Sequence, residues 1–375
     1  MNQLQMVDLG NQYQKIKSEI NQSIQQVLDT TSFINGEAVK RFEEELEAYL
    51  AVKYVIPCAN GTDALQIALM ALDLKPGDEV IVPAFTYVAT AEVIALLGLV
   101  PVMIDVYDDD FNISVEEIKQ AIGPKTKAIV PVHLFGQCAH LEAIMKIANE
   151  HGIAVIEDNA QAIGSDYYWS NGTKSKSGAI AHIGCTSFFP SKNLGCYGDG
   201  GAIFTNDDQL AQKITMIANH GQSKRYYHDV VGVNSRLDSI QAAVLSIKLK
   251  HLDEYASARV AAADYYDQAF NNINSIITPF RNKHSSHVFH QYTLRITDGR
   301  RDALKEYLDL KKIPCAIYYP VPLYEQKAFV AYRGQVTHLP ITDQLCKEVI
   351  SLPMHTELNP SLQNIIISEV LNFIN

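Results

Sequence analysis

One lysine of the chain stands in a setting that suits covalent chemistry. Lys192 follows an apolar run that ends in the aromatic residues 188–189 and a proline, and a turn rich in glycine, 195–201, comes after it. Most lysines are surface charges, but these neighbours describe a tightly shaped, apolar turn. Burial lowers the pKa of a lysine amine, and a neutral amine can form a Schiff base with an aldehyde.

A carboxylate ends the most apolar predicted strand of the chain. Asp158 closes the run 153–159, and a buried acid is costly unless a partner compensates its charge. A protonated ring nitrogen is the natural partner for such a group, which makes Asp158 a candidate functional residue. The alternative is an aspartate that is solvated or caps a helix.

Two further segments have residue types that suit a phosphorylated, planar ligand. In the turn 58–64, Gly61 lets backbone amides approach closely, and Thr62 opens a helix whose N-terminus favours an anion. The alternative is a simple N-cap. Tyr87 follows a predicted strand, where its ring could lie flat on a planar group, although core packing explains most single aromatic residues.

The elements that position these residues alternate along the chain. Strand-like runs at 79–85, 100–106, 128–134, 153–159 and 183–189 are separated by helix-like stretches at 63–72, 89–97, 114–121 and 141–151. This order predicts an α/β fold, doubly wound around a mostly parallel sheet that helices cover on both faces. Ligands of such sheets bind at the carboxyl ends of the strands, where the candidate residues stand.

The two ends of the chain differ from this pattern. Helical spacing at 11–28 and 37–50 predicts an N-terminal helical arm. A long helix over 237–271 is expected to connect to a smaller α+β domain with strands at 290–296 and 315–319 and helices at 301–310 and 341–349. We expect a large domain over 1–250, including the arm, and a small C-terminal domain over 251–375.

Composition narrows the classes of function. The chain has 375 residues, 47% of them hydrophobic, and a formal charge of −11 without a long basic run, so nucleic acid is not an expected partner. Six cysteines without a C-x-x-C pair fit a reduced, cytoplasmic protein. No signal peptide and no membrane anchor are visible, because the longest apolar run, 93–104, is too short to span a bilayer.

Taken together, the motifs resemble one known family. Ser187-x-x-x-x-Lys192 followed by Gly198-Asp199-Gly200-Gly201, with the Asp158-x-x-Gln161 pair, is similar to the DegT/DnrJ/EryC1/StrS sugar aminotransferases, which depend on pyridoxal 5′-phosphate (PLP). The resemblance covers nearly the whole chain. It implies the fold type I of PLP-dependent transferases, with a mostly parallel sheet and a smaller α+β C-terminal domain, and a homodimer whose active sites are shared between subunits.

The resemblance also implies roles for single residues. Lys192 would bind the cofactor aldehyde and move a proton during catalysis, and Asp158 would keep the pyridine nitrogen protonated. Tyr87 would stack on the ring, with Phe85 as the fallback, and Gln161 would bond the 3′ oxygen. The cofactor phosphate would be held by Gly61, Thr62, Ser187 and, from the neighbouring subunit, Asn234. No metal is expected.

For the substrate, the sequence is similar to family members that act on 3-keto sugars. The segments 58–66 and 196–208 resemble transaminases of UDP-2-acetamido-2-deoxy-3-oxo-glucuronate, with L-glutamate as amino donor, in bacterial surface polysaccharide, lipopolysaccharide and O-antigen synthesis. Arg236 would pair with the sugar carboxylate, unless it is only a structural arginine at a helix start, and Arg225 would lie near the pyrophosphate. Tyr319 belongs to a motif in which many relatives have a histidine.

Three alternatives stay open at this point. The first is a dTDP-3-keto-6-deoxyhexose aminotransferase, which only Arg236 and overall similarity distinguish from the main hypothesis. The second is a sugar dehydratase on the same scaffold, against which Lys192 argues, since such enzymes have histidine in its place. The third is a non-catalytic PLP-binding regulator, which would tolerate loss of Lys192.

Overall fold

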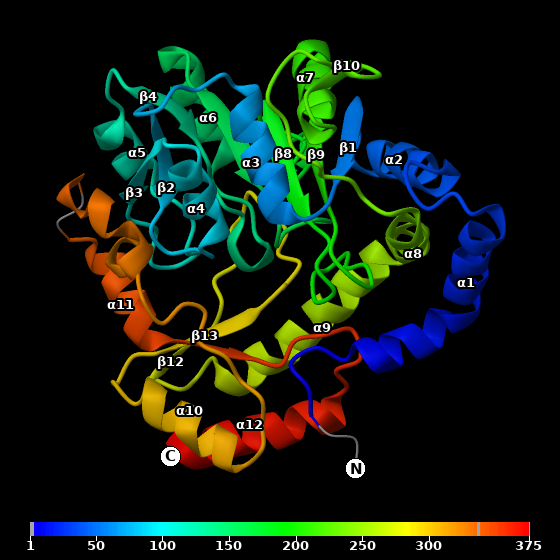
Figure 1. Ribbon diagram of the computed structural model, residues 1–375. Coiled ribbons are helices and arrows are strands. Elements are labelled where there is room, and N and C mark those ends of the chain that lie inside the picture. Colours follow the sequence, from blue (N-terminus) through cyan, green and yellow to red (C-terminus); the bar gives the residue numbers. More distant parts are fainter. Residues whose placement is uncertain (1–3, 336–337, 375) are drawn as a thin grey trace.

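A seven-stranded sheet forms the centre of the computed structural model, which describes residues 4–335 and 338–374. Its strand order is β1-β9-β8-β5-β4-β2-β3 (Figure 1). The strands are β1 (Tyr54–Cys58), β2 (Glu79–Pro83), β3 (Val100–Ile104), β4 (Thr126–Ile129), β5 (Ala154–Asp158), β8 (Ile183–Ser187) and β9 (Gly201–Thr205). All neighbours from β3 to β8 are parallel, and β9 is antiparallel to β8 and β1. The predicted mostly parallel sheet is therefore confirmed.

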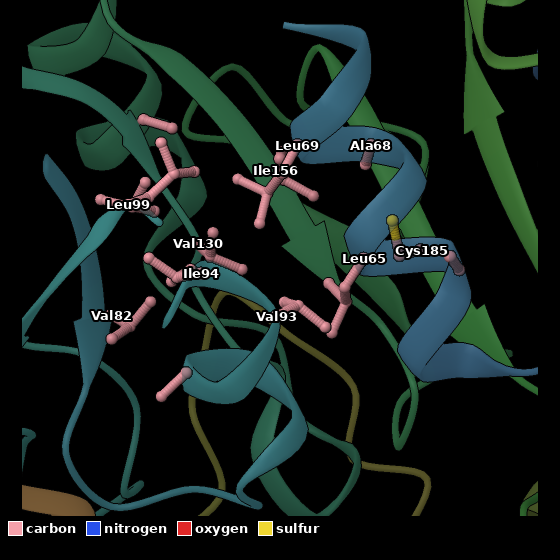
Figure 2. Close-up of a cluster of buried hydrophobic side chains, with 14 of the residues drawn as sticks. Leu65, Ala68, Leu69, Val82, Val93, Ile94, Leu99, Val130, Ile156 and Cys185 are labelled. Carbon is pink, nitrogen blue, oxygen red and sulfur yellow. The ribbon is translucent and has the colours of Figure 1, made fainter. Parts of the chain in front are cut away.

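Helices cover both faces of this sheet. On one face lie α3 (Gly61–Ala71), α4 (Ala89–Leu96) and α7 (Asp208–Ala218), and on the other α5 (Val115–Ala121), α6 (Leu141–His151), α2 (Glu37–Leu50) and α8 (Ser239–Leu249). Strand alternation explains the two layers: Val80 and Val82 of β2 point to the first core and Ile81 to the second. Figure 2 shows Leu65 and Leu69 of α3 packed over the same sheet face as Val82.

A second hydrophobic core lies in the C-terminal third of the chain. It is built on a small antiparallel sheet of β12 (Ile276–Ile277), β13 (Tyr292–Ile296) and β14 (Val349–Leu352). Figure 1 shows the helices α9 (Leu252–Phe270), α10 (Arg301–Leu310) and α12 (Pro360–Ile374) around this sheet. They contribute fully buried side chains such as Tyr266, Leu304 and Ile366 to the same core. The domain boundary at residue 250 stays a prediction.

Shorter elements connect and flank these two parts. The first helix, α1 (Leu9–Thr30), packs on α8. The others are the hairpins β6 (Asp166–Tyr168) with β7 (Lys174–Lys176) and β10 (Gln222–Lys224) with β11 (Tyr227–His228), the 3-10 turns η1 (Leu134–Gly136), η2 (Leu323–Glu325) and η3 (Lys327–Gln335), and α11 (Pro340–Glu348). Among the described residues, no helix has the length and apolar character that crossing a membrane requires.

Two predicted elements are wrong in detail. The long helix over 237–271 is two helices, α8 and α9, which are separated at residues 250–251. The separation lets α8 pack against α1 and α2 while α9 packs against α12. The segment 315–319 is not a strand: it makes one isolated bridge, Ala316 to Ser351, because prolines at 314 and 320 remove backbone donors on either side.

Candidate active site

A cavity of about 770 Å³ opens at the carboxyl ends of β5 and β8. One wall comes from the large sheet and the start of α3, and the other from residues 290–291 and 318–319 of the C-terminal part. Of the residues singled out in the sequence, it brings together Gly61, Thr62, Tyr87, Asp158, Gln161, Ser187, Lys192 and Tyr319. The cavity is therefore the candidate active site.

The start of α3 forms an anion-binding end of the cavity. Asn60 begins the helix, because its side-chain oxygen accepts a hydrogen bond from the amide of Asp63 at 2.8 Å. The next residue, Gly61, lies so close to β8 that a Cβ atom would stand 2.6 Å from Cβ of Ser187. Only glycine fits there, and Gly61, Thr62 and Ser187 line the cavity beside the N-terminus of the helix, which favours an anion.

Asp158, at the end of β5, offers a carboxylate that the protein only partly satisfies. The hydroxyl of Thr90 donates to Oδ2 at 2.8 Å, and the amide of Ala160 donates to Oδ1 at 3.2 Å. The side chain is 5% exposed and lines the cavity. Thr90 of α4 thus orients the carboxylate of Asp158, which can still bind a cationic group inside the cavity.

The preceding residue shows what a purely structural acid looks like in the same strand. Glu157 is fully buried and accepts hydrogen bonds from the ring of His133 at 2.8 Å and from the backbone amides of Gly178, Ile180 and Ala181 at 2.6 to 2.7 Å. Because β5 side chains alternate between faces, Glu157 points away from the cavity. Its bonding capacity is used up within the fold.

Lys192 reaches the cavity from the turn after β8. Its backbone amide donates to the carbonyl of Phe189 at 2.8 Å, which fixes the turn. Burial lowers the pKa of Lys192 to about 8, against the opposing effect of the Asp158 charge. Since an ordinary lysine titrates near 10.5, the amine of Lys192 is neutral in a much larger fraction of molecules near neutral pH, as attack on an aldehyde requires.

Gln161 connects the two walls. Its side-chain oxygen accepts from the amide of Phe135 at 2.7 Å, and its nitrogen donates to the hydroxyl of Tyr319 at 3.2 Å. The carbonyl of Phe135 in turn accepts from the amide of His290 at 2.8 Å. A run of hydrogen bonds thus joins the large sheet to both C-terminal segments that close the cavity.

The sequence profile of the DegT/DnrJ/EryC1/StrS aminotransferase family matches residues 14–371. The chain belongs to this family. It is 46% identical, over 98% of its length and 100% of the relative, to "UDP-2-acetamido-2-deoxy-3-oxo-D-glucuronate aminotransferase" of Pseudomonas aeruginosa. It is 44% identical, over 98% of both chains, to a "Pleiotropic regulatory protein" of Geobacillus stearothermophilus. It is also 44% identical to a UDP-N-acetyl-3-dehydro-alpha-D-glucosamine 3-aminotransferase of Acidithiobacillus ferrooxidans, over 94% of this chain and 93% of the relative.

Solved structures agree with this membership. A family aminotransferase from Brucella abortus superposes with a TM-score of 0.93 at 41% identity, over 99% of this chain and 100% of that one. NtdA from Bacillus subtilis, solved with bound cofactor PMP, gives 0.89 at 30% identity, over 98% of this chain and 83% of that one. The fold is therefore that of PLP-dependent transferases, and the chain is a PLP-dependent nucleotide-sugar aminotransferase.

The residues of the cavity fit this cofactor. The start of α3 suits a phosphate, the carboxylate of Asp158 suits a protonated ring nitrogen, and the amine of Lys192 suits an aldehyde. Tyr87 lies at the cavity wall with 56% of its surface exposed, 6.4 Å from the ring of Tyr319. Phe85, in contrast, is 1% exposed and packs among Phe111 and Phe135, so it cannot replace Tyr87.

Three residues singled out in the sequence lie outside the cavity of their own chain. Asn234 is exposed and pairs with Asn219 in an isolated bridge, and Arg236, two residues on, is half-buried. Arg225 is exposed beside Tyr226, between β10 and β11. The residue after Asn234 nevertheless contacts the start of α3, because the hydroxyl of Ser235 donates a hydrogen bond to the side chain of Asp63 at 2.6 Å.

Thr90, behind Asp158, and His290, in the cavity wall, are among the residues that the sequence analysis did not single out. Thr90 lies within α4, 1% exposed, where its spacing fits an ordinary helix, and only the fold shows that it contacts Asp158. His290 lines the cavity from a segment that has no motif. No local signal in the sequence marks either residue.

Proposed function

We propose that the protein transfers the amino group of L-glutamate to C3 of a UDP-linked 3-keto sugar, namely UDP-2-acetamido-2-deoxy-3-oxo-glucuronate. The observation that carries this proposal is the pairing of Lys192 and Asp158 in one cavity of a chain that is 46% identical, end to end, to an enzyme named for that substrate. The relative from Acidithiobacillus ferrooxidans, whose named substrate is also a UDP-linked 3-keto sugar, supports the position of the transfer.

The residues of the cavity would divide the work as follows. PLP, when bound, supplies an electron sink for the pair released at Cα of the amino donor. Asp158 would hold a proton on the ring nitrogen, and Thr90 would orient Asp158. The Nζ atom of Lys192 would take the proton from Cα of the amino donor. It would then deliver this proton to the carbon that is bonded to the transferred nitrogen on the cofactor side. The start of α3 and Ser187 would anchor the phosphate, Tyr87 would cover the ring, and Gln161 would bond its 3′ oxygen.

The remaining parts of the proposal concern assembly and setting. In the proposed homodimer, Asn234 would reach the phosphate of the neighbouring site, and Arg236 and Arg225 would reach its sugar carboxylate and pyrophosphate. Their exposed or half-buried positions outside their own cavity support this arrangement. We propose two domains, 1–250 and 251–375, and a cytoplasmic enzyme that supplies precursors of surface polysaccharide, lipopolysaccharide or O-antigen.

A spectroscopic experiment tests this function. The PLP-loaded protein should be yellow, should bleach with L-glutamate, and should regain its colour with one keto sugar from a panel of UDP- and dTDP-linked compounds. Recovery with a dTDP-linked 3-keto-6-deoxyhexose alone would replace the proposed substrate. Colour that ignores every amino donor would overturn the proposal.

A second candidate is a PLP-binding regulator, which the name of the relative from Geobacillus stearothermophilus favours. The two functions differ in what they require of Lys192. A regulator would keep its function after Lys192→Ala, whereas an aminotransferase would lose it. The presence of lysine at this position argues against a dehydratase.

A further inference from the structure

A second buried lysine contacts the turn after β8, residues 188–200, which carries Lys192. Lys248, in the last turn of α8, is 1% exposed, and its Nζ atom donates a hydrogen bond to the carbonyl of Gly195 at 2.6 Å. Nζ also lies 5.1 Å from the ring centre of Tyr197. Although burial lowers the pKa of Lys248 to about 8, most molecules still carry its proton at neutral pH. The bond to Gly195 is therefore charge-assisted.

The carbonyl that Lys248 holds belongs to a residue that packs directly on the backbone before Lys192. A Cβ atom at Gly195 would stand 2.3 Å from the carbonyl oxygen of Pro190 and 2.8 Å from that of Phe189. The carbonyl of Phe189 also accepts the hydrogen bond from the amide of Lys192 at 2.8 Å. Because these backbones are in contact, a displacement of Gly195 would displace Lys192 as well.

The helix α8 holds the same turn at a second point, and the segment before it contacts the opposite end of the cavity. Gln241 of α8 accepts a hydrogen bond from the amide of Tyr197 at 2.8 Å. Ahead of the helix, the hydroxyl of Ser235 donates to Asp63, in the first turn of α3. The helix and its leading segment thus fix the turn after β8 relative to the anion-binding start of α3.

An apolar side chain would suit the surroundings of Lys248 better than a charge. Leu245 and Leu249 of α8 are buried in a core that also contains Leu194 of the turn. A buried charge is costly to desolvate, and exchanging such groups for apolar residues of similar volume is often neutral or stabilising. Stability of the core therefore does not explain a lysine here, and the bond to Gly195 is what the lysine adds.

We propose that Lys248 is a positioning residue for the transfer reaction, which holds the turn 188–200 so that the Nζ atom of Lys192 keeps its place in the cavity. This inference rests on the proposed function. Lys248 does not line the cavity, so it acts through Lys192. A base that moves a proton between two carbons depends on its position, because a misplacement of about 1 Å can slow a reaction about a hundredfold.

The test is Lys248→Met, which keeps the length of the side chain but removes the charge and the donor to Gly195. Single-turnover bleaching of the PLP-loaded protein by L-glutamate gives a maximal rate and a half-saturating concentration. We expect the maximal rate to fall about ten- to a hundredfold, while the half-saturating concentration stays within about twofold of wild type. A lysine that only stabilises the fold would leave the rate per folded, loaded molecule unchanged.

Two further variants separate positioning from stability. Ile247→Ala is the matched control, because it removes a buried side chain one residue earlier, in the core that α8 shares with α1. It should unfold at a lower urea concentration but keep the maximal rate. Gln241→Leu removes the acceptor of the Tyr197 amide and should lower the maximal rate about two- to tenfold at an unchanged half-saturating concentration. This variant decides the question if Lys248→Met does not fold.

Three results would overturn the inference and leave the proposed function intact. The first is a wild-type maximal rate in folded Lys248→Met or, if that variant does not fold, in Gln241→Leu. The second is an equal loss of rate in Lys248→Met and Ile247→Ala. The third is a raised half-saturating concentration at an unchanged maximal rate, which would place Lys248 in donor binding. If wild-type protein itself fails to bleach with glutamate, the proposed function fails, and the inference fails with it.

Discussion

The two walls of the cavity are built in different ways. The sheet-side wall takes Asp158 from the end of β5, Lys192 from the turn that follows β8, and Gly61 and Thr62 from the start of α3. The C-terminal wall takes His290 from a loop before β13, and this wall is held to the sheet by hydrogen bonds that run through Phe135 and Gln161. The first wall follows from local sequence, and the second only from long-range contacts. The expected division is that the first performs the chemistry and the second selects what reacts.

Removing the amine of Lys192 should lower the rate of the glutamate half-reaction more than any other change to either wall. We expect Lys192→Ala to slow bleaching by glutamate about 10⁴-fold or more, because the variant lacks the amine that we propose both to bind the aldehyde and to act as the base at Cα. Stopped-flow absorbance of the PLP-loaded variant measures this rate. Lys174→Ala, at an exposed lysine on β7, should react like wild type. If Lys192→Ala reacts at the wild-type rate, the reacting group is not Lys192 and the sheet-side wall does not perform the chemistry.

The next largest effect is expected at Asp158. Asp158→Asn should keep the cofactor but lower the rate of the glutamate half-reaction about 10²- to 10³-fold, because a neutral amide no longer stabilises the proton on the ring nitrogen. Cofactor content by absorbance and single-turnover rates check the two parts. Loss of the cofactor together with an unchanged rate per loaded site would contradict this role.

Glu157→Gln is the matched control for Asp158→Asn, since it makes the same chemical change one residue earlier in β5. The NH₂ group of the glutamine would replace a carboxylate oxygen that now accepts hydrogen bonds from backbone N–H groups. These donors would then face another donor. We expect the free energy of unfolding in urea to fall by about 2–3 kcal/mol while the rate per folded molecule stays the same. The opposite pattern would mean that alternation along the strand does not separate structure from chemistry.

Part of this site could be predicted from the sequence, and the reason is geometric. Parallel strands bring their carboxyl ends to one edge, so knowing that Asp158 and Lys192 follow strands is enough to place them together. The same reasoning could not find Thr90, which is one residue of an ordinary helical pattern, or His290, whose position depends on a bond to Phe135.

Errors in the predicted fold have a related cause. The apolar pattern of 237–271 is continuous through residues 250–251, although the helix axis changes there, because both helices are apolar on the sides that they bury. The segment 315–319 has the composition of a strand but leads to the cavity, where the hydroxyl of Tyr319 accepts a hydrogen bond from Gln161 and the backbone of the segment makes only the bridge at Ala316. Local composition does not distinguish a sheet edge from a cavity wall.

The pH at which Lys192 loses its proton provides a smaller but sharper test. Only the neutral amine adds to an aldehyde, so the rate at which the apoprotein recombines with PLP should rise about tenfold per pH unit below the pKa of Lys192 and level off above it. With a pKa of about 8, the break falls far below the 10.5 of an ordinary lysine. In Asp158→Asn the break should move to lower pH, because the Asp158 charge raises this pKa. A break near 10.5 would show that the sheet-side wall leaves the amine exposed.

The smallest expected effect concerns the bond that joins the walls. In Tyr319→Phe the side-chain nitrogen of Gln161 loses its partner at 3.2 Å, so Gln161 should be held less firmly, and PLP should bind the apoprotein about two- to tenfold more weakly. Tyr318→Phe is the control, since Tyr318 lines the same wall but its hydroxyl bonds to no described residue. Equal PLP affinity in wild type and both variants would mean that the sheet-side wall positions Gln161 alone, through Phe135. A loss confined to Tyr319→Phe would show that the substrate-selecting wall also helps to hold the cofactor, which couples the two halves of the cavity.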